Sequence, residues 1–269
     1  MMSHPAFADP GPRLDAFIKV EGDHTGAEVV QYGVGSIYSF FDGRRDRRLF
    51  DTEAYAVRRY QRIDGGWLRL HREVALYRDP ATGKIINSWY NPYLERNVEV
   101  IDIVQEFNRQ YLVSDLGKVF DVGISAHDDD AHLHRNFFIS RPAELPPAQY
   151  PLHGQEPTWD LAEYHNYFCK LSDLLNPNVP NAAAIGSTNS VCSYLPWLEM
   201  GNVPGFLIFH MRSKKLARVE DMSADLVAYV AKRYPTHLTA PTEFKPNDLA
   251  TTGLNFYKTV IDAKRKETH

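Results

Sequence analysis

The sequence predicts a mainly β protein, an antiparallel meander that closes into a lipocalin-like barrel or a strongly curved sheet, with a few flanking helices near the C-terminus. Two observations predict it. Turn signals rich in Asp, Gly and Pro, such as RIDGGW, YRDPATGKII and SDLGKVF, favour hairpin connections. Between them, short runs rich in Val, Ile, Tyr, Phe and Trp recur at a spacing of about ten residues, at residues 28–41, 54–63, 66–77, 84–90, 98–104, 110–114, 118–124 and 135–140.

The remaining segments surround this meander. Residues 1–13 contain three prolines and predict a flexible arm, and residues 14–269 are expected to form a single β-rich domain that begins with a short helix or strand. Five prolines in residues 141–157 indicate a long connection, and the apolar residues of 159–176 fit a helix or a strand that runs into a helical turn, of which we favour the second. A strand over 204–216, a helix over 222–235 with Ser223 as N-cap, and a terminal helix over 253–266 complete the prediction.

Composition excludes several classes of function. The net charge of −4 is spread along 269 residues, so no basic surface for nucleic acid is expected. The N-terminus lacks the apolar run of a secretory signal, and no segment approaches the roughly 20 apolar residues of a membrane span. We therefore expect a cytoplasmic protein without nucleic-acid or membrane partners, in which Cys169 and Cys192 are free thiols, and the sequence leaves a homodimer open.

The run GWLRLHREVALY carries the most informative alternation. One face of the strand has Leu68, Leu70, Val74 and Leu76, and the other has Trp67, Arg69, His71, Glu73 and Tyr77. The aliphatic face is expected to pack against the core. The other face either meets water or lines a pocket, where Trp67 and Tyr77 would stack on a planar ligand and His71 and Glu73 would transfer protons.

Two further segments supply candidate residues. Trp89, Tyr90 and Asn91 precede a proline, and Asp102 lies where apolar residues dominate, so burial would raise the pKa of its carboxyl and suit it to acid–base chemistry. The alternative is a strand-end aspartate that is bonded to a backbone amide or an arginine. Trp197 and Glu199 precede a turn that contains Gly and Pro, and His210 lies on the strand that follows. Trp197 and His210 are either core residues or members of a site.

Metal and nucleotide sites are not expected. The segment AHDDDAHLHR brings His127, His132 and His134 close together, and an i, i+2 pair of histidines can chelate a metal, but three successive aspartates are equally typical of a solvated turn. Neither HExxH nor paired CxxC patterns are present, and no glycine pattern makes a P-loop or a dinucleotide fingerprint. The sequence thus predicts neither a bound metal nor a cofactor.

The segments REVALYRDPATGKIINSWYNPYLERNVEV and YLPWLEMGNVPGFLIFHMRSKKL resemble a bacterial domain family of unknown function, numbered eighteen thirty-eight. The matching features are Arg72 to Val74, Tyr77 to Gly83, Trp89 to Pro92 and Leu195 to Gly201. The resemblance runs from about Leu14 to Pro241. It implies a single domain and brings neither a reaction nor catalytic residues.

We therefore predict a cofactor-independent enzyme of lyase, isomerase or dehydratase type that acts on a small hydrophobic or aromatic compound. His71 or Asp102 would move the proton, with Glu73 and His210 as further candidates, and Arg69 would stabilise an oxyanion. The substrate would contact Trp67, Tyr77, Trp89, Tyr90, Asn91, Trp197 and Glu199. The alternatives are a lipocalin-like protein that binds a small hydrophobic ligand without chemistry, whose pocket would lack an ionisable pair, and an interaction module with a filled interior.

Overall fold

The computed structural model describes residues 4–41, 47–246 and 250–267. Its main feature is a nine-stranded antiparallel sheet with the strand order β6-β3-β2-β1-β11-β10-β9-β8-β7. The strands are β1 (Val29–Phe40), β2 (Arg47–Ile63), β3 (Gly66–Arg78), β6 (Ile103–Leu112), β7 (Gly123–His127), β8 (Asp130–Pro142), β9 (Thr158–Lys170), β10 (Ala184–Cys192) and β11 (Phe206–Leu216). Most alternating runs joined by Gly and Asp turns thus fold as strands, as the sequence predicts, but residues 118–122 of the predicted run 118–124 lie outside a strand.

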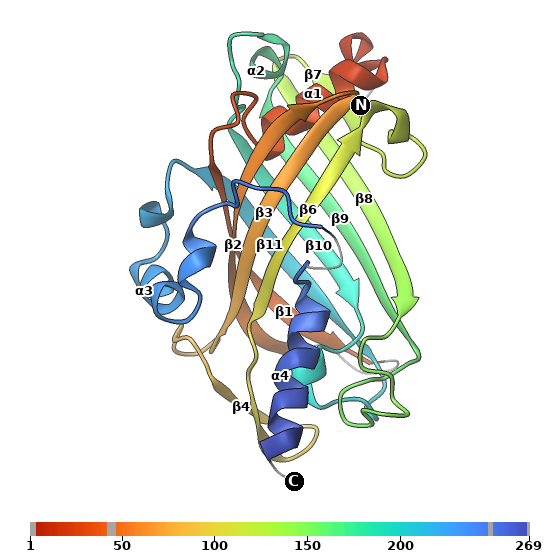
Figure 1. The fold of residues 1–269 in the computed structure, drawn as a ribbon, viewed down its shortest axis with the longest axis vertical. Coiled ribbons are helices and arrows are strands. Elements are labelled where there is room, and N and C mark those ends of the chain that lie inside the picture. Colours follow the sequence, from red (N-terminus) through yellow and green to blue (C-terminus); the bar gives the residue numbers. More distant parts are fainter. Residues whose placement is uncertain (1–3, 42–46, 247–249, 268–269) are drawn as a thin grey trace.

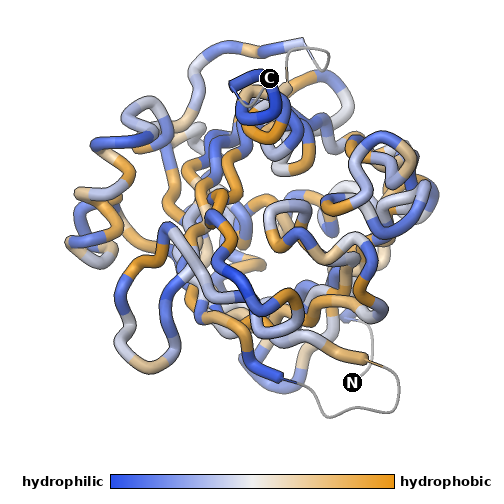
Figure 2. Tube along the Cα trace, turned by 90° about the horizontal axis from the view of Figure 1, so that it is seen from below, coloured by the Kyte–Doolittle hydropathy of each residue, from blue (hydrophilic) through white to orange (hydrophobic). Residues whose placement is uncertain are grey.

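The sheet curls into a half-barrel, with β6 and β7 as its edge strands (Figure 1). This confirms the prediction of a mainly β, strongly curved antiparallel sheet. Helix α1 (Pro10–Glu21) lies at one end of the half-barrel, and α4 (Gly253–Glu267) lies beside β6 toward the other end. Seen from below, the strands curl round and α3 (Ala224–Arg233) lies outside them (Figure 2).

Smaller elements fill the connections. The hairpin of β4 (Ser88–Asn91) and β5 (Arg96–Glu99) follows β3, and α2 (Leu171–Leu175) follows β9 directly, as predicted for residues 159–176. Short 3-10 turns are η1 (Pro5–Phe7), η2 (Val113–Asp115), η3 (Pro196–Leu198), η4 (Val219–Asp221) and η5 (Pro235–Leu238). Within the segment predicted as a flexible arm, η1 buries Phe7.

The predicted helices near the C-terminus are present. Ser223 is the N-cap residue of α3, but its hydroxyl donates to Glu53 Oε1 at 2.6 Å instead of capping the helix. The predicted run over residues 98–104 is divided, because residues 100–102 lie in the connection between β5 and β6. No helix of the described residues is long and apolar enough to cross a membrane.

Three apolar clusters hold the molecule together. On the inner, concave face, one cluster packs α1 against the sheet through residues such as Phe17 and Tyr111, and a second surrounds Trp197 near α4. A third lies on the outer face, where Val74 and Leu76 of β3 pack against Leu226 and Val230 of α3. The aliphatic face of β3 is therefore the outer one, and its ionisable face points inward.

Helix α1 is held to α2 and to the sheet by two lysines, the buried Lys19 and the partly buried Lys215. Lys19 donates to three backbone carbonyls at and after α2, at residues 173, 174 and 176, over 2.6–3.2 Å. Lys215 of β11 donates to the carbonyls of Lys19 and Gly22 at the C-terminal end of α1, at 2.8 and 3.3 Å. Gly22 is required there, because a Cβ atom at this position would overlap the ring of Tyr60. These contacts place Glu21, the last residue of α1, inside the half-barrel.

Candidate functional site

The inner face of β3 carries ionisable side chains between the two apolar clusters. Arg69, His71 and Glu73 are successive inward residues of this strand, and they belong to neither cluster. Glu73 lies deep in the molecule, and yet its side chain is 27% exposed. Exposure at that depth means that solvent reaches the concave face, so Glu73 lines an interior space.

His71 is held by two charged neighbours. The Nε of Arg58 donates to Nδ1 of His71 at 3.2 Å, so Nδ1 carries no proton and Nε2 must donate to Glu73 Oε2 at 3.0 Å. Burial lowers the pKa of His71 to about 4, and the nearby charges of Arg69 and Arg58 act in the same direction. His71 is therefore neutral at physiological pH, with both ring nitrogens engaged, and its role is to orient Glu73.

Glu73 is the exposed member of this pair. Burial raises the pKa of its carboxyl, but the hydrogen bond from His71 and the charges of Arg58 and Arg69 outweigh burial and lower it. The carboxylate is thus ionised at neutral pH and available to accept a proton from a bound molecule.

Glu21 connects the two walls of the half-barrel. Its carboxylate accepts hydrogen bonds from Arg58 Nη1 at 2.5 Å and from Tyr60 at 3.3 Å, both on β2, and from Tyr167 on β9. Burial raises the pKa of Glu21, but Arg58, Arg69 and the bond from Tyr167 hold it well below its usual range. Glu21 is therefore a permanent buried anion that balances Arg58.

The opposite wall repeats the carboxylate–imidazole pairing. Glu163 and His165 are inward residues of β9, and His165 Nε2 lies 2.9 Å from Glu163 Oε2. Thr188 on β10 contacts His165 Nδ1 at 3.2 Å, and Ser190 donates to Glu163 Oε1 at 3.3 Å. Both side chains of this pair reach solvent, with 24% of Glu163 and 19% of His165 exposed.

Small residues separate the two pairs along the inner face. Gly33, Ala54 and Ala75 are register partners on β1, β2 and β3, and Gly186 lies on β10. A Cβ atom at Gly186 would lie 2.3 Å from Ser213 Oγ, and one at Gly33 would lie 3.4 Å from Ser213 Cβ, so neighbouring side chains occupy the wall at these positions.

The predicted aromatic contacts on β3 lie in the packed ends instead of beside Glu73. Trp67 stacks on His24 with ring centroids 4.8 Å apart, and its Nε1 donates to Asp15 of α1 at 2.8 Å. Tyr77 is fully buried, and its hydroxyl lies 3.2 Å from that of Tyr257 on α4. These two aromatic residues bound the ionisable region at its two ends.

The other predicted contact residues belong to the α4 end. Trp197 is buried, and Tyr77 and Trp89 pack against it with ring centroids at 5.0 and 6.4 Å. The Nδ2 of Asn91 donates to the carbonyl of Leu198 at 2.9 Å, and Glu199 forms an ion pair with Arg96. Tyr90 is 56% exposed. The segments Trp89 to Pro92 and Leu195 to Gly201 therefore contact each other and close this end of the half-barrel.

Two predicted catalytic residues do not share the inner face. Asp102 is buried between the sheet and α3, where it accepts from Tyr229 and Tyr234, both at 2.9 Å, and lies 3.6 Å from Arg233. Burial raises the pKa of Asp102, as predicted, although these contacts oppose the shift. His210 is exposed on the outer face of β11, and its Nδ1 lies 2.6 Å from Asn189.

The histidine-rich segment forms the β7–β8 hairpin. His132 and His134 lie on the outer face of β8, where His132 stacks on Phe168, and His127 is exposed at the turn. Within the described ranges, no group of three His, Cys, Asp or Glu side chains is placed to hold a metal ion. Cys169 and Cys192 are free thiols.

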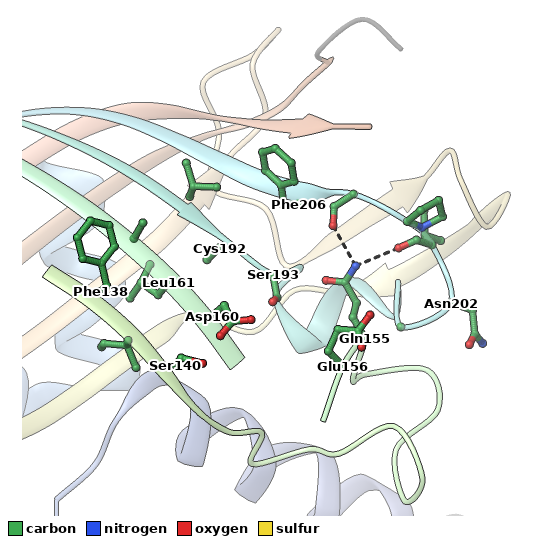
Figure 3. A pocket seen from close by; sticks show the side chains of 17 residues that line it. Phe138, Ser140, Gln155, Glu156, Asp160, Leu161, Cys192, Ser193, Asn202 and Phe206 are labelled. Carbon is green, nitrogen blue, oxygen red and sulfur yellow. Dashed lines mark hydrogen bonds between the residues drawn. The ribbon is translucent and has the colours of Figure 1, made fainter. Parts of the chain in front are cut away.

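The outer face carries a separate groove of about 750 Å³ near the ends of β8–β11 (Figure 3). Phe138 and Phe206 project into it, and the amide of Gln155 donates to the carbonyls of Val203 and Gly205 at 3.0 and 3.1 Å. Its charged lining residues are two acids, Glu156 and Asp160. The groove therefore offers apolar surface without an acid–base pair.

The chain belongs to the family described as "Protein of unknown function (DUF1838)", whose model matches residues 26–260. This confirms the resemblance drawn from the sequence, and the match includes both carboxylate–imidazole pairs. Helix α1 and Glu21 precede the matched region. Among curated proteins, none matches the chain.

Sequence reasoning missed several inner-face residues, namely Glu21, Arg58, Arg109, Arg135, Glu163 and His165. The spacing of Glu163 and His165 was a usable sequence signal, because these residues are two positions apart, as His71 and Glu73 are, in the reverse order. Arg69 and Arg109 are register partners on β3 and β6, and the curvature of the sheet brings Arg135 of β8 to them.

Proposed function

We propose that this protein is a cofactor-independent enzyme of lyase, isomerase or dehydratase type. In this proposal, a small hydrophobic or aromatic compound enters the half-barrel and lies on the inner face between β3 and β9. The observation that carries the proposal is a carboxylate–imidazole pair on each of two inner walls, His71–Glu73 on β3 and Glu163–His165 on β9, in which Glu73, Glu163 and His165 are partly exposed to solvent.

Each group has a distinct role in this mechanism. Glu73, ionised and oriented by His71, accepts a proton from the substrate. His165 and Glu163 exchange a proton with the other side of the substrate, and the Arg69 guanidinium stabilises negative charge that develops on an oxygen atom. A pair of titratable groups in different environments is the usual arrangement for acid–base chemistry at neutral pH.

Deuterium exchange tests the proposal even when the product of the reaction has not been identified. Purified protein is incubated in D2O with a panel of small aromatic and aliphatic ketones, hydroxy acids and unsaturated acids, and each compound is followed by mass spectrometry. Abstraction of a proton and return of a deuteron adds mass to the starting compound or to its isomer, chromatographic separation distinguishes those two, and dehydration removes water. We expect at least one compound to react, and Glu73→Gln to slow its reaction by about a hundredfold or more, the usual contribution of a general base.

The exposed Glu220 provides a matched control, because Glu220→Gln makes the same chemical change far from the inner face. Equal rates for the wild type and Glu73→Gln would remove Glu73 from the mechanism. Compounds that bind without exchange or conversion would overturn the enzyme proposal.

The second candidate function is non-catalytic binding of a small hydrophobic molecule, and the outer groove favours it. A crystal structure of the protein with a bound apolar compound would distinguish the two. Density between Phe138 and Phe206 supports binding in the groove, whereas density beside Glu73 supports the inner site.

A further inference from the structure

Three arginines on the inner face surround one tyrosine ring. The guanidinium carbons of Arg69 on β3, Arg109 on β6 and Arg135 on β8 lie 5.5, 5.2 and 5.6 Å from the ring centroid of Tyr111. These residues come from both edges of the sheet, so they meet across the opening of the half-barrel at its α1 end.

These guanidinium groups have no hydrogen-bond acceptors among the described residues. Arg69 and Arg135 are only 7% and 5% exposed, and the Nε atom of each is buried without a partner. Among the described residues, the carboxylate within ion-pair distance is Glu21, which lies 4.0 Å from Arg69 and is already bonded to Arg58 at 2.5 Å. Buried charges are normally paired, so two buried guanidinium groups beside a half-buried third, with one long ion pair among the three, indicate a missing anion.

Tyr111 adds a fourth unused donor. Its hydroxyl is fully buried and has no hydrogen-bond partner in the described part of the chain. Burial raises the pKa of this phenol, but the charges of Arg69, Arg135 and Arg109 outweigh burial and lower it. Other buried tyrosines of the inner face, such as Tyr60, have a raised pKa. The potential at Tyr111 is thus strongly positive.

We propose that Arg69, Arg109, Arg135 and the hydroxyl of Tyr111 form a subsite for an oxyanion, a carboxylate or phosphate group carried by the substrate. This inference rests on the proposed function, because it takes the anion to be one end of the molecule that reacts beside Glu73. Guanidinium groups bind the paired oxygens of both oxyanions with two parallel hydrogen bonds. Arg69 and Glu73 are four residues apart on one strand, roughly 13 Å between Cα atoms, and the charge of Arg69 acts on the Glu73 carboxyl by lowering its pKa. The subsite therefore selects small organic acids or phosphate esters over neutral compounds of the same shape.

Calorimetric titration of the full-length protein tests the subsite with three probes of similar shape: benzoate, phenyl phosphate and neutral benzamide. We expect one of the anions to bind at least about tenfold more tightly than benzamide, the effect of one charge-assisted hydrogen bond. Tighter benzoate identifies a carboxylate site, and tighter phenyl phosphate identifies a phosphate site. Equal affinity for all three probes would overturn the inference.

The variant Arg109→Gln provides a second readout that a structural arginine would not give. It should weaken binding of the preferred anion about tenfold, and it should raise the unfolding midpoint of the ligand-free protein because it removes an unpaired like charge. Arg212→Gln, on the exposed outer face of β11, is the matched control and should change neither quantity. A lower midpoint with unchanged anion affinity would show that Arg109 serves only the fold.

The outcomes separate this inference from the proposed function. Tight anion binding without any deuterium exchange leaves the oxyanion subsite standing and overturns the enzyme proposal. If neutral compounds react and Arg109→Gln leaves their turnover unchanged, the enzyme proposal stands and the oxyanion subsite is overturned.

Discussion

Replacing Glu21 by Gln tests whether a buried anion holds the two walls of the half-barrel together. The substitution preserves the shape of the side chain and removes its charge, which leaves Arg58 buried without its partner at 2.5 Å. Breaking a buried ion pair from one side usually costs about 3–5 kcal/mol. We therefore expect the free energy of unfolding at pH 7 to fall by about 3 kcal/mol, a large part of the roughly 5–15 kcal/mol typical of a folded protein.

The pH dependence of this loss follows from the direction of the pKa shift. Folding lowers the pKa of Glu21 below the ordinary glutamate value of 4.5. The unfolded chain therefore takes up a proton at Glu21 first as the pH falls, and the stabilisation by the carboxylate is complete above about pH 5 and decreases below 4.5. The difference between wild type and Glu21→Gln should be constant from about pH 6 to 8 and should shrink toward about pH 4.

Urea unfolding followed by tryptophan fluorescence measures both quantities, and Glu220→Gln at the exposed surface is the control. A loss below about 1 kcal/mol, the scale of an exposed ion pair, would refute the buried-anion argument. A loss that stays the same at about pH 4 would also refute it, because the charge would then not be its cause.

Two further predictions concern single groups. His71 should remain neutral with its proton on Nε2 down to about pH 5, because burial lowers its pKa to about 4. Nitrogen-15 spectra, in which the His71 signals are assigned with the variant His71→Asn, measure this protonation state. A titration midpoint near the ordinary value of 6.5 would contradict the prediction. Asp102→Asn should weaken the attachment of α3 and lower the free energy of unfolding by about 1–3 kcal/mol, but leave deuterium exchange of any substrate unchanged. Loss of that exchange with normal stability would return Asp102 to the catalytic group.

The sequence was sufficient for the long strands and for the two faces of β3, but residues 103–112 form one strand instead of parts of two predicted runs. It could not determine which face points inward, since that depends on α3, which lies about 150 residues further along the chain and covers Val74 and Leu76. For the same reason Asp102 looked like a member of a strand face, whereas two tyrosines of the α3 region bind it outside the half-barrel.

The candidate site was only partly predictable. Arg69, His71 and Glu73 share one strand, so their alternation is visible in the sequence. Arg109 and Arg135 lie on the two edge regions of the sheet, and only its curvature brings them together. The family motifs around Trp89 and Trp197 do not lie at the candidate site. They pack together at the α4 end of the half-barrel.

The outward aliphatic face of β3 has a consequence for how the chain reaches its native state. Until residues 224–233 have folded, Val74 and Leu76 are presented to water on a strand that is already able to pair. A chain shortened before α3 would keep this surface uncovered and tend to self-associate, because a hydrophobic sheet face without cover is an aggregation site. Helix α3 thus acts as a built-in shield for the sheet, and soluble expression depends on it.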